Sequence, residues 1–322
     1  MMQRRHFMLG SAAALGLPAV WAQSPWPQKP VRVVIPYVAG GVTDSVGRKL
    51  MDKMSHALGQ SFVVENKGGA GGTVGMAEVA KAAPDGYTLA LSAISPLTLS
   101  PHLMKLSYDP FKDIMAVVPM MYSPVYVLAT TAFKGSSWQE LIAQAKASPG
   151  SIRIATSGVG SVGHIMVEQI QAKTGAQFIH VPYKGVAQTV TDAVGAHFEI
   201  MLGNPFPTVN SLIEQGKLRV LATTGPQRAP NQPKAATLAE LGVPEANLTS
   251  MFGFMAPAGT PAAVVEKLNA VVQQQVQTPE IQEILKATDN VALLQDSAAF
   301  GELLRKESEN NAAIIKKAGI RL

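Results

Sequence analysis

A strand, a glycine-rich loop and an amphipathic helix follow one another directly in residues 31–50, and this succession most restricts the folds open to the chain. The run VRVVI is β-branched and is bounded by Pro36, as is typical of a buried strand. In the helix that follows, apolar residues recur every fourth position along one face, at Val46, Leu50, Met54 and Leu58. Thr43 or Asp44 is expected to cap this helix. Since the first N–H groups of a helix lack intrahelical partners, the loop AGGVT could bind an anion, with an ordinary turn as the alternative.

Strands and short helices alternate along both halves of the sequence. SFVVEN, a helix over MAEVAKAA and the strand YTLALS succeed one another in the first half, and the second half repeats this order from SIRIATS to LRVLATT. The alternation predicts parallel βαβ units. We therefore expect an α/β fold with doubly wound, mostly parallel sheets that carry helices on both faces.

The apolar segment AVVPMMYSPVYVLATT, which Pro119 and Pro124 interrupt, predicts an extended passage between two lobes. A return crossing is expected at SMFGFMAPAG, because a chain that leaves one lobe and comes back must cross twice. The C-terminal helices are accordingly assigned to the first lobe. We predict one lobe from residues 23–124 and 249–322 and a second from residues 125–248, with a ligand cleft between them.

The N-terminal residues have the order of an export signal, with a basic start, an apolar stretch and small residues before Ala22. Residues 1–22 are therefore predicted to be a signal peptide. Arg4-Arg5 followed by Phe7 resembles a twin-arginine signal, with general secretion as the alternative. No later stretch reaches about 18 apolar residues, so we expect a soluble mature protein in a Gram-negative periplasm.

The composition excludes several functions. The chain has no cysteine, which rules out disulfides, thiolate metal ligands and cysteine nucleophiles. A formal net charge of +5 without clustered lysines and arginines does not fit a nucleic-acid partner. The histidines form no H-E-x-x-H spacing, and the chain has no G-x-S-x-G nucleophile elbow. We expect a protein that is not an enzyme, with no catalytic residues, no metal and no cofactor.

Residues 158–163 satisfy the dinucleotide fingerprint G-x-G-x-x-G between an expected strand and an expected helix. A nucleotide site also needs an acidic residue after the next strand, about 20 residues on, where this chain has Tyr183 and Lys184. A nucleotide-dependent oxidoreductase is therefore a less favoured alternative. The glycines are better explained by a small anion that approaches the start of the helix capped by Ser161.

Two similar loops, AGGVTD and SGVGS, thus open one helix in each half of the chain. If the two lobes face each other, both helix starts look into one cleft and clamp a small carboxylate, which closure about a hinge would bury. His164, one turn into the second helix, is either near this site or a structural histidine. His180 lies in an apolar strand and is expected in the core.

Several strings occur together and in order along the mature chain: WPQKPVRVVIPYVAGGVTD, VVENKGGAGGTVG, AKAAPDGYTL, VPYKG and FMAPAGTP. Through these strings and their order, the chain resembles the Bug family, the TctC-like periplasmic receptors of tripartite tricarboxylate transporters. The resemblance implies a two-lobed periplasmic-binding-protein fold of type II, also called a Venus flytrap. It also implies that main-chain groups and ordered waters at the first glycine loop hold a ligand carboxylate while the second lobe closes over it.

The resemblance carries ligand-contact roles to the matching positions. These are Tyr37, Gly40, Gly41, Thr43, Asp44, Ser92 and Ser95 in the first lobe and Ser157, Gly158, Gly160, Ser161, His164 and Asn204 in the second. Val42 departs from the family pattern, which often has a glycine there, and Lys67-Gly68 stands where Arg-Pro is usual. Val42 is bulkier than glycine and narrows the expected cleft.

The function predicted from residues and resemblance together is a receptor that delivers a small organic carboxylate to membrane permease subunits. A ligand-sensing co-receptor for a membrane sensor kinase is the alternative that keeps the same fold. The sequence leaves open whether the ligand is an aliphatic diacid, an amino acid or an aromatic acid, and whether the cleft is open or closed.

Overall fold

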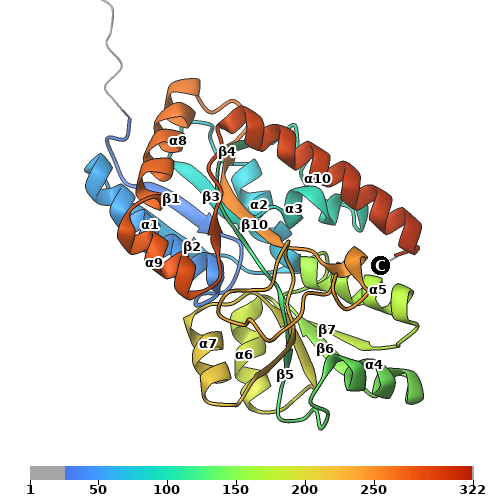
Figure 1. The fold of residues 1–322 in the computed structure, drawn as a ribbon. Coiled ribbons are helices and arrows are strands. Elements are labelled where there is room, and N and C mark those ends of the chain that lie inside the picture. The colour runs from blue at the N-terminus through green and yellow to red at the C-terminus, as the bar shows by residue number, and fades with distance from the viewer. Residues whose placement is uncertain (1–25, 321–322) are drawn as a thin grey trace, which may run out of the picture.

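Two β-sheets, one in each lobe, frame the structure of residues 26–320, which a computed structural model describes (Figure 1). The predicted signal peptide, residues 1–22, lies outside the described residues. Within residues 26–320, no helix has both the length and the apolar character needed to cross a membrane.

The first sheet contains the strands β1 (Val31–Ile35), β2 (Phe62–Asn66), β3 (Thr88–Ala93), β4 (Ile114–Ser123), β10 (Ser250–Pro257) and β11 (Val291–Ala292). Its helices are α1 (Val42–Leu58), α2 (Thr73–Ala80), α3 (Ser95–Thr98), α8 (Ala262–Val276), α9 (Pro279–Ala287) and α10 (Ser297–Ala318). Short 3-10 helices lie at Ala70–Gly72 and Ser100–His102.

The second sheet contains β5 (Tyr126–Ala129), β6 (Arg153–Thr156), β7 (Ile179–Pro182), β8 (Ile200–Gly203) and β9 (Arg219–Ala222). Its helices are α4 (Trp138–Ala147), α5 (Val162–Thr174), α6 (Val186–Val194) and α7 (Pro207–Glu214), and a 3-10 helix lies at Pro244–Ala246. The strands of the first sheet lie before residue 125 or after residue 248, and the strands of the second sheet lie between these limits. The exact lobe limits, 124/125 and 248/249, remain a prediction.

The two-lobed α/β fold predicted from the sequence is confirmed, but the sheets are mixed and not mostly parallel. The strand orders are β11-β4-β10-β3-β1-β2 and β7-β6-β8-β5-β9. Only the blocks β2-β1-β3 and β7-β6-β8 are parallel. A strand that enters from the other lobe starts at the cleft edge and must run away from it. For this reason β10 is antiparallel to β3 and β4, and β5 is antiparallel to β8 and β9.

Helices cover both faces of the first sheet, because successive side chains of a strand point to opposite faces. From β1, Val33 and Ile35 join the core under α1, α8 and α9, whereas Val34 joins a separate core with α2, α3 and α10. In Figure 1 these two helix groups lie on opposite sides of the first sheet. Burying each such side chain contributes about 1.5–3 kcal/mol to folding.

The apolar face predicted for α1 is the face that packs on the sheet. Val46, Leu50 and Met54 are buried and Leu58 is half-buried. The four-residue spacing in the sequence was therefore sufficient to identify the buried face of α1. The second sheet has the same layering, with α6 and α7 on one face and α4 and α5 on the other.

Candidate functional site

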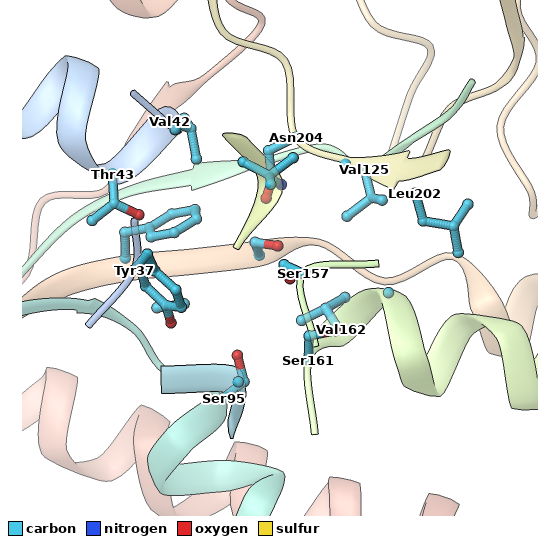
Figure 2. Close-up of a pocket in the computed structure, with 18 of the residues that line it drawn as sticks. Tyr37, Val42, Thr43, Ser95, Val125, Ser157, Ser161, Val162, Leu202 and Asn204 are labelled. Atoms are coloured by element: carbon cyan, nitrogen blue, oxygen red, sulfur yellow. The ribbon is translucent and has the colours of Figure 1, made fainter. Parts of the chain in front are cut away.

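A cavity of about 50 Å³ lies between the two lobes. It is large enough to hold more than one water molecule. Its lining from the first sheet and its loops is Tyr37, Val38, Gly41, Val42, Thr43, Asp44, Gly71, Ala93, Ser95, Ser250 and Phe252. From the crossing and the second lobe come Val125, Ser157, Ser161, Val162, Gly163, Val186, Leu202, Gly203 and Asn204 (Figure 2).

The start of α1 forms one wall of the cavity. The N-cap is Gly41, with φ −80° and ψ −179°, and no side chain caps the helix, so the predicted cap at Thr43 or Asp44 is wrong. The helix begins at Val42, two residues earlier than a cap at Thr43 would place its start and three residues earlier than a cap at Asp44 would. Thr43 and Asp44 therefore lie in the first turn, and the N–H groups of that turn have no intrahelical acceptor.

Asp44 holds the first loop in shape. Its Oδ2 accepts the Gly40 N–H at 3.0 Å, and its Oδ1 accepts from Arg48 Nε and Asn66 Nδ2, both at 3.0 Å. Burial alone would raise the pKa of Asp44, but the hydrogen bonds from Arg48, Gly40 and Asn66 lower it below the ordinary value. The carboxylate is thus charged, paired and committed to the loop.

The start of α5 forms the opposite wall. Ser161 caps this helix as predicted, and its Oγ accepts the His164 N–H at 3.2 Å. Val162 and Gly163, the first two residues of α5, line the cavity. Two helices from different lobes therefore begin at one cavity, as Figure 2 shows for Val42, Thr43, Ser161 and Val162.

Glycines bring the two lobes into contact around the cavity. A Cβ at Gly158 would lie 3.1 Å from the Gly71 nitrogen, and a Cβ at Gly71 would overlap the Val159 carbonyl oxygen. A Cβ at Gly41 would lie 3.0 Å from Val186 Cγ1, and one at Gly68 would lie 2.9 Å from the Lys184 carbonyl oxygen. These approaches link residues of the two lobes, so the cleft is closed in this structure.

Eight of the residues predicted to contact a ligand line the cavity: Tyr37, Gly41, Thr43, Asp44, Ser95, Ser157, Ser161 and Asn204. Five others do not: Gly40, Ser92, Gly158, Gly160 and His164. The Gly40 N–H binds Asp44, and the Ser92 hydroxyl donates to Ala93 O at 2.8 Å. Gly158 and Gly160 serve close packing instead, since Cβ atoms there would press on Gly71 and on Ser100.

His164 and His180 are paired with each other and do not reach the cavity. Their rings stack with centroids 4.4 Å apart and planes 11° from parallel. His164 Nδ1 accepts the Gly160 N–H at 3.3 Å, and His180 Nε2 lies 2.7 Å from Thr156 Oγ1. Burial lowers the pKa of His164, and burial together with His164 lowers the pKa of His180 to about 4. Both rings are therefore neutral near pH 7.

Other lining residues were missed by sequence reasoning: Val38, Gly71, Ala93, Val125, Val162, Gly163, Val186, Leu202, Gly203, Ser250 and Phe252. Val125, Ser250 and Phe252 lie at the two crossings, so the predicted crossings could have identified them. Val186 and Leu202 had no local signal in the sequence, and Val186 reaches Gly41 of the first loop only through the packing of the two lobes.

The cavity lining is nearly free of charge. Among the described residues that line it, none is Lys, Arg or His, and Asp44 is the one carboxylate. Burial raises the pKa of Tyr37 to about 12, opposed by hydrogen bonds with Ser92 and Ala93, so this phenol stays neutral. An anion in the cavity would be met by hydroxyl groups and by the N–H groups of the helix starts.

Neither a metal site nor a dinucleotide site is supported by the geometry. Within residues 26–320, no group of three or more His, Asp or Glu side chains is arranged to hold a metal ion. The loop at residues 158–163 packs against Gly71 of the other lobe, where a pyrophosphate would have to sit in a nucleotide site.

Comparisons with known proteins agree with this geometry. Residues 46–320 match the family described as the tripartite tricarboxylate transporter family receptor. The chain is 36% identical, over 99% of both chains, to a protein of Cupriavidus necator named "UPF0065 protein in gbd 5'region".

Two solved structures are similar to this chain. The periplasmic binding protein BugD is 32% identical with a TM-score of 0.87, covering 92% of this chain and 99% of BugD. A Rhodopseudomonas palustris protein, described as R. palustris Rpa4515 with adipate, is 30% identical with a TM-score of 0.86, over 92% of this chain and 99% of its own.

Proposed function

Because this chain belongs to the family of tripartite tricarboxylate transporter receptors, the Bug family, we propose that it is a periplasmic receptor for a small organic carboxylate. In this proposal the ligand is captured between the two lobes and delivered to membrane permease subunits of a tripartite tricarboxylate-type transporter. The adipate held by the relative of 30% identity supports a carboxylate as the ligand class.

The observation that carries the proposal is the meeting of two helix starts at one closed cavity. The first turns of α1 and α5 come from different lobes and line the same space. A helix start presents N–H donors and a partial positive charge, which are the features that bind a carboxylate without a cationic side chain. A ligand held by both helices would stabilise the closed arrangement, because it contacts both lobes only when they are together.

The connections between the lobes suit opening and closing. The passage from β4 to β5 is a few residues long, and Val125 N donates to Thr224 Oγ1 at 2.8 Å beside it. Asn204 Nδ2 donates to Pro124 O at 2.9 Å, which ties the second-lobe wall to the same passage. Small rotations at these segments would expose the cavity while both sheets stay intact.

A binding screen tests the proposal. We expect some members of a library of mono- and dicarboxylates to raise the melting temperature of the purified mature protein, since a ligand that binds only the native state stabilises it. The same screen includes NAD(P)H as a matched negative probe. Stabilisation by nucleotides with no response to any carboxylate would contradict the proposal.

Delivery to a transporter needs a separate test. We expect a strain that lacks this protein to lose uptake of the radiolabelled ligand identified in the screen, and the wild-type chain to restore it. Unchanged uptake would favour the alternative of a sensing co-receptor and leave carboxylate binding in place.

A further inference from the structure

We infer that opening of the cleft narrows a second cavity, so that a side chain that fills this cavity holds the lobes closed and strengthens ligand binding. The second cavity has a volume of about 400 Å³. We call it the hinge-side cavity, and its lining includes Tyr122, Pro124, Gly225, Arg228, Thr249 and Val291. The part of the inference that concerns affinity rests on the proposed function, whereas the position of the lobes can be measured without a ligand.

The two crossings between the lobes form a wall that both cavities share. Val125 and Ser250 line the ligand cavity, whereas their chain neighbours Pro124 and Thr249 line the hinge-side cavity. This is the alternation of side chains along an extended chain. The crossings lie side by side, because Ser250 pairs with Ser123 where β10 meets β4. They therefore form a two-stranded ribbon with one cavity on each side.

The first-lobe wall of the hinge-side cavity comes from β4, β11 and α9. Val291 of β11 pairs with Tyr122 of β4, and residues directly opposite each other on antiparallel strands have neighbouring side chains on one face of the sheet. α9 contributes Leu285 to the lining and packs against α1 and β11. This wall therefore belongs to the first lobe.

The opposite wall, residues 224–228, is fixed to the second lobe. The Gly225 N–H donates to Asn247 Oδ1 at 3.2 Å, and Asn247 Nδ2 donates to the Gly225 carbonyl oxygen at 2.8 Å. Arg228 Nε donates to Glu240 Oε1 at 2.9 Å. The segment that contains Glu240 also contributes Leu238 to the core of the second lobe. Residues 224–228 therefore move with the second lobe.

A rotation about the ribbon changes the two cavities in opposite directions. Within residues 26–320, the main chain passes between the two sheets at these two crossings only. A hinge rotation that separates the starts of α1 and α5 on one side brings the two walls of the hinge-side cavity together on the other. A side chain that fits this cavity when the cleft is closed is then overpacked when the cleft is open.

Val291 is the position from which the cavity can be filled at little cost to folding. Its side chain is 44% exposed, so a larger group there displaces no core residue. The cavity is larger than the cavities of about 150 Å³ that hold benzene, so it can hold the indole of Val291→Trp. Val63→Trp is the matched control, because Val63 is 52% exposed on β2, the other edge strand of the same sheet, and lines neither cavity.

Small-angle scattering of the ligand-free mature protein tests the inference without any carboxylate. We expect a smaller radius of gyration in Val291→Trp than in wild type and in Val63→Trp, because the filled cavity disfavours the open lobes. Val291→Phe fills less of the cavity and keeps the test valid if the indole prevents folding, with a smaller change in the same direction. A radius of gyration equal to or larger than that of wild type in the folded variant overturns the inference.

Calorimetric titration measures the effect on binding, with the carboxylate that gives the largest thermal shift in the screen as the probe. We expect Val291→Trp to bind it about threefold or more tightly than wild type, since the apparent affinity rises with the fraction of closed protein. Val63→Trp should remain within about twofold of wild type. Unchanged or weaker binding by Val291→Trp overturns the inference. A screen in which no carboxylate binds is a different result, which would overturn the proposed function and leave the scattering test in force.

Discussion

The stacked rings of His164 and His180 hold the glycine loop, residues 158–161, that precedes α5. The Gly160 N–H donates to His164 Nδ1, which requires that nitrogen to be unprotonated. The centroids of the His164 and His180 rings are 4.4 Å apart, and His180 Nε2 is hydrogen-bonded to Thr156 Oγ1 at the end of β6. Two neutral imidazoles thus connect β6, the glycine loop and the first turn of α5.

This pair predicts a loss of stability in mild acid. The pKa of His180 falls from an ordinary value of 6.5 to about 4 on folding, and the pKa of His164 is also lowered. The unfolded chain therefore takes up protons between about pH 6.5 and pH 4 that the folded chain does not, so the free energy of unfolding decreases as the pH falls through this window. Urea unfolding followed by circular dichroism at closely spaced pH values measures the effect.

Replacing one ring tests the assignment. His180→Gln removes the titrating group and keeps an amide within reach of Thr156, so the slope of stability against pH should become smaller in this window. His56→Gln, at an exposed histidine of α1, serves as the control and should keep the wild-type slope. An equal slope in all three proteins would contradict the role of the pair.

At the scale of elements, α4 and α5 have equivalent caps but different surroundings. Ser137 Oγ accepts the Glu140 N–H at 3.2 Å, and Ser161 Oγ accepts the His164 N–H at the same distance. Only Ser161 lines the cavity, because α4 packs on the second sheet elsewhere in that lobe. The two serines therefore separate the helix-capping role from the ligand role.

We predict that Ser137→Ala and Ser161→Ala each lower the free energy of unfolding by about 1 kcal/mol, the usual effect of losing an N-cap. Ser161→Ala should also weaken binding of the best carboxylate by about tenfold, because a hydroxyl donor and the orientation of the first turn are lost together. Calorimetric titration and urea unfolding of both variants make the comparison. Equal ligand affinity in the two variants would exclude Ser161 from the site.

At the scale of the whole molecule, a buried link joins the lobes on the hinge side. The Tyr126 hydroxyl, at the first residue of β5, donates to Asp289 Oδ2, and the Asn231 N–H donates to Asp289 Oδ1 at 3.0 Å. Asp289 follows α9 of the first lobe, is buried and has a positive φ of 50°. The Asp289 carboxylate thus holds the start of β5 and the segment around Asn231 against the first lobe.

Tyr126→Phe should loosen this link. We expect a loss of about 1–3 kcal/mol of stability, because a buried acceptor of Asp289 is left without its donor. We also expect a larger radius of gyration in small-angle scattering without ligand, since the lobes are held together less firmly. Tyr108→Phe is the control, because the Tyr108 hydroxyl donates to Pro96 O at 2.8 Å within the first lobe. An unchanged radius of gyration in Tyr126→Phe would assign the link to stability alone.

Features that depend on a few neighbouring residues were determined by the sequence alone. The strand at 31–35, the apolar face of α1 and the Ser161 cap follow from periodicity and from a side chain that reaches an N–H three residues away. The two glycine loops at helix starts were found in the same way. The position of the α1 cap was not, because by local preference Thr43 is as suitable as Gly41 and Asp44 is more suitable.

Only the tertiary structure decided what lies across the cleft. It showed that Gly158 packs against Gly71 and that Val186 faces Gly41, although each pair is far apart in the sequence. It also made the sheets mixed, since β5 and β10 enter their sheets from the opposite lobe. The physical reason is common to all three: local hydrogen bonds and periodicity specify a helix or strand, whereas contacts between lobes depend on how the crossings bring the finished elements together.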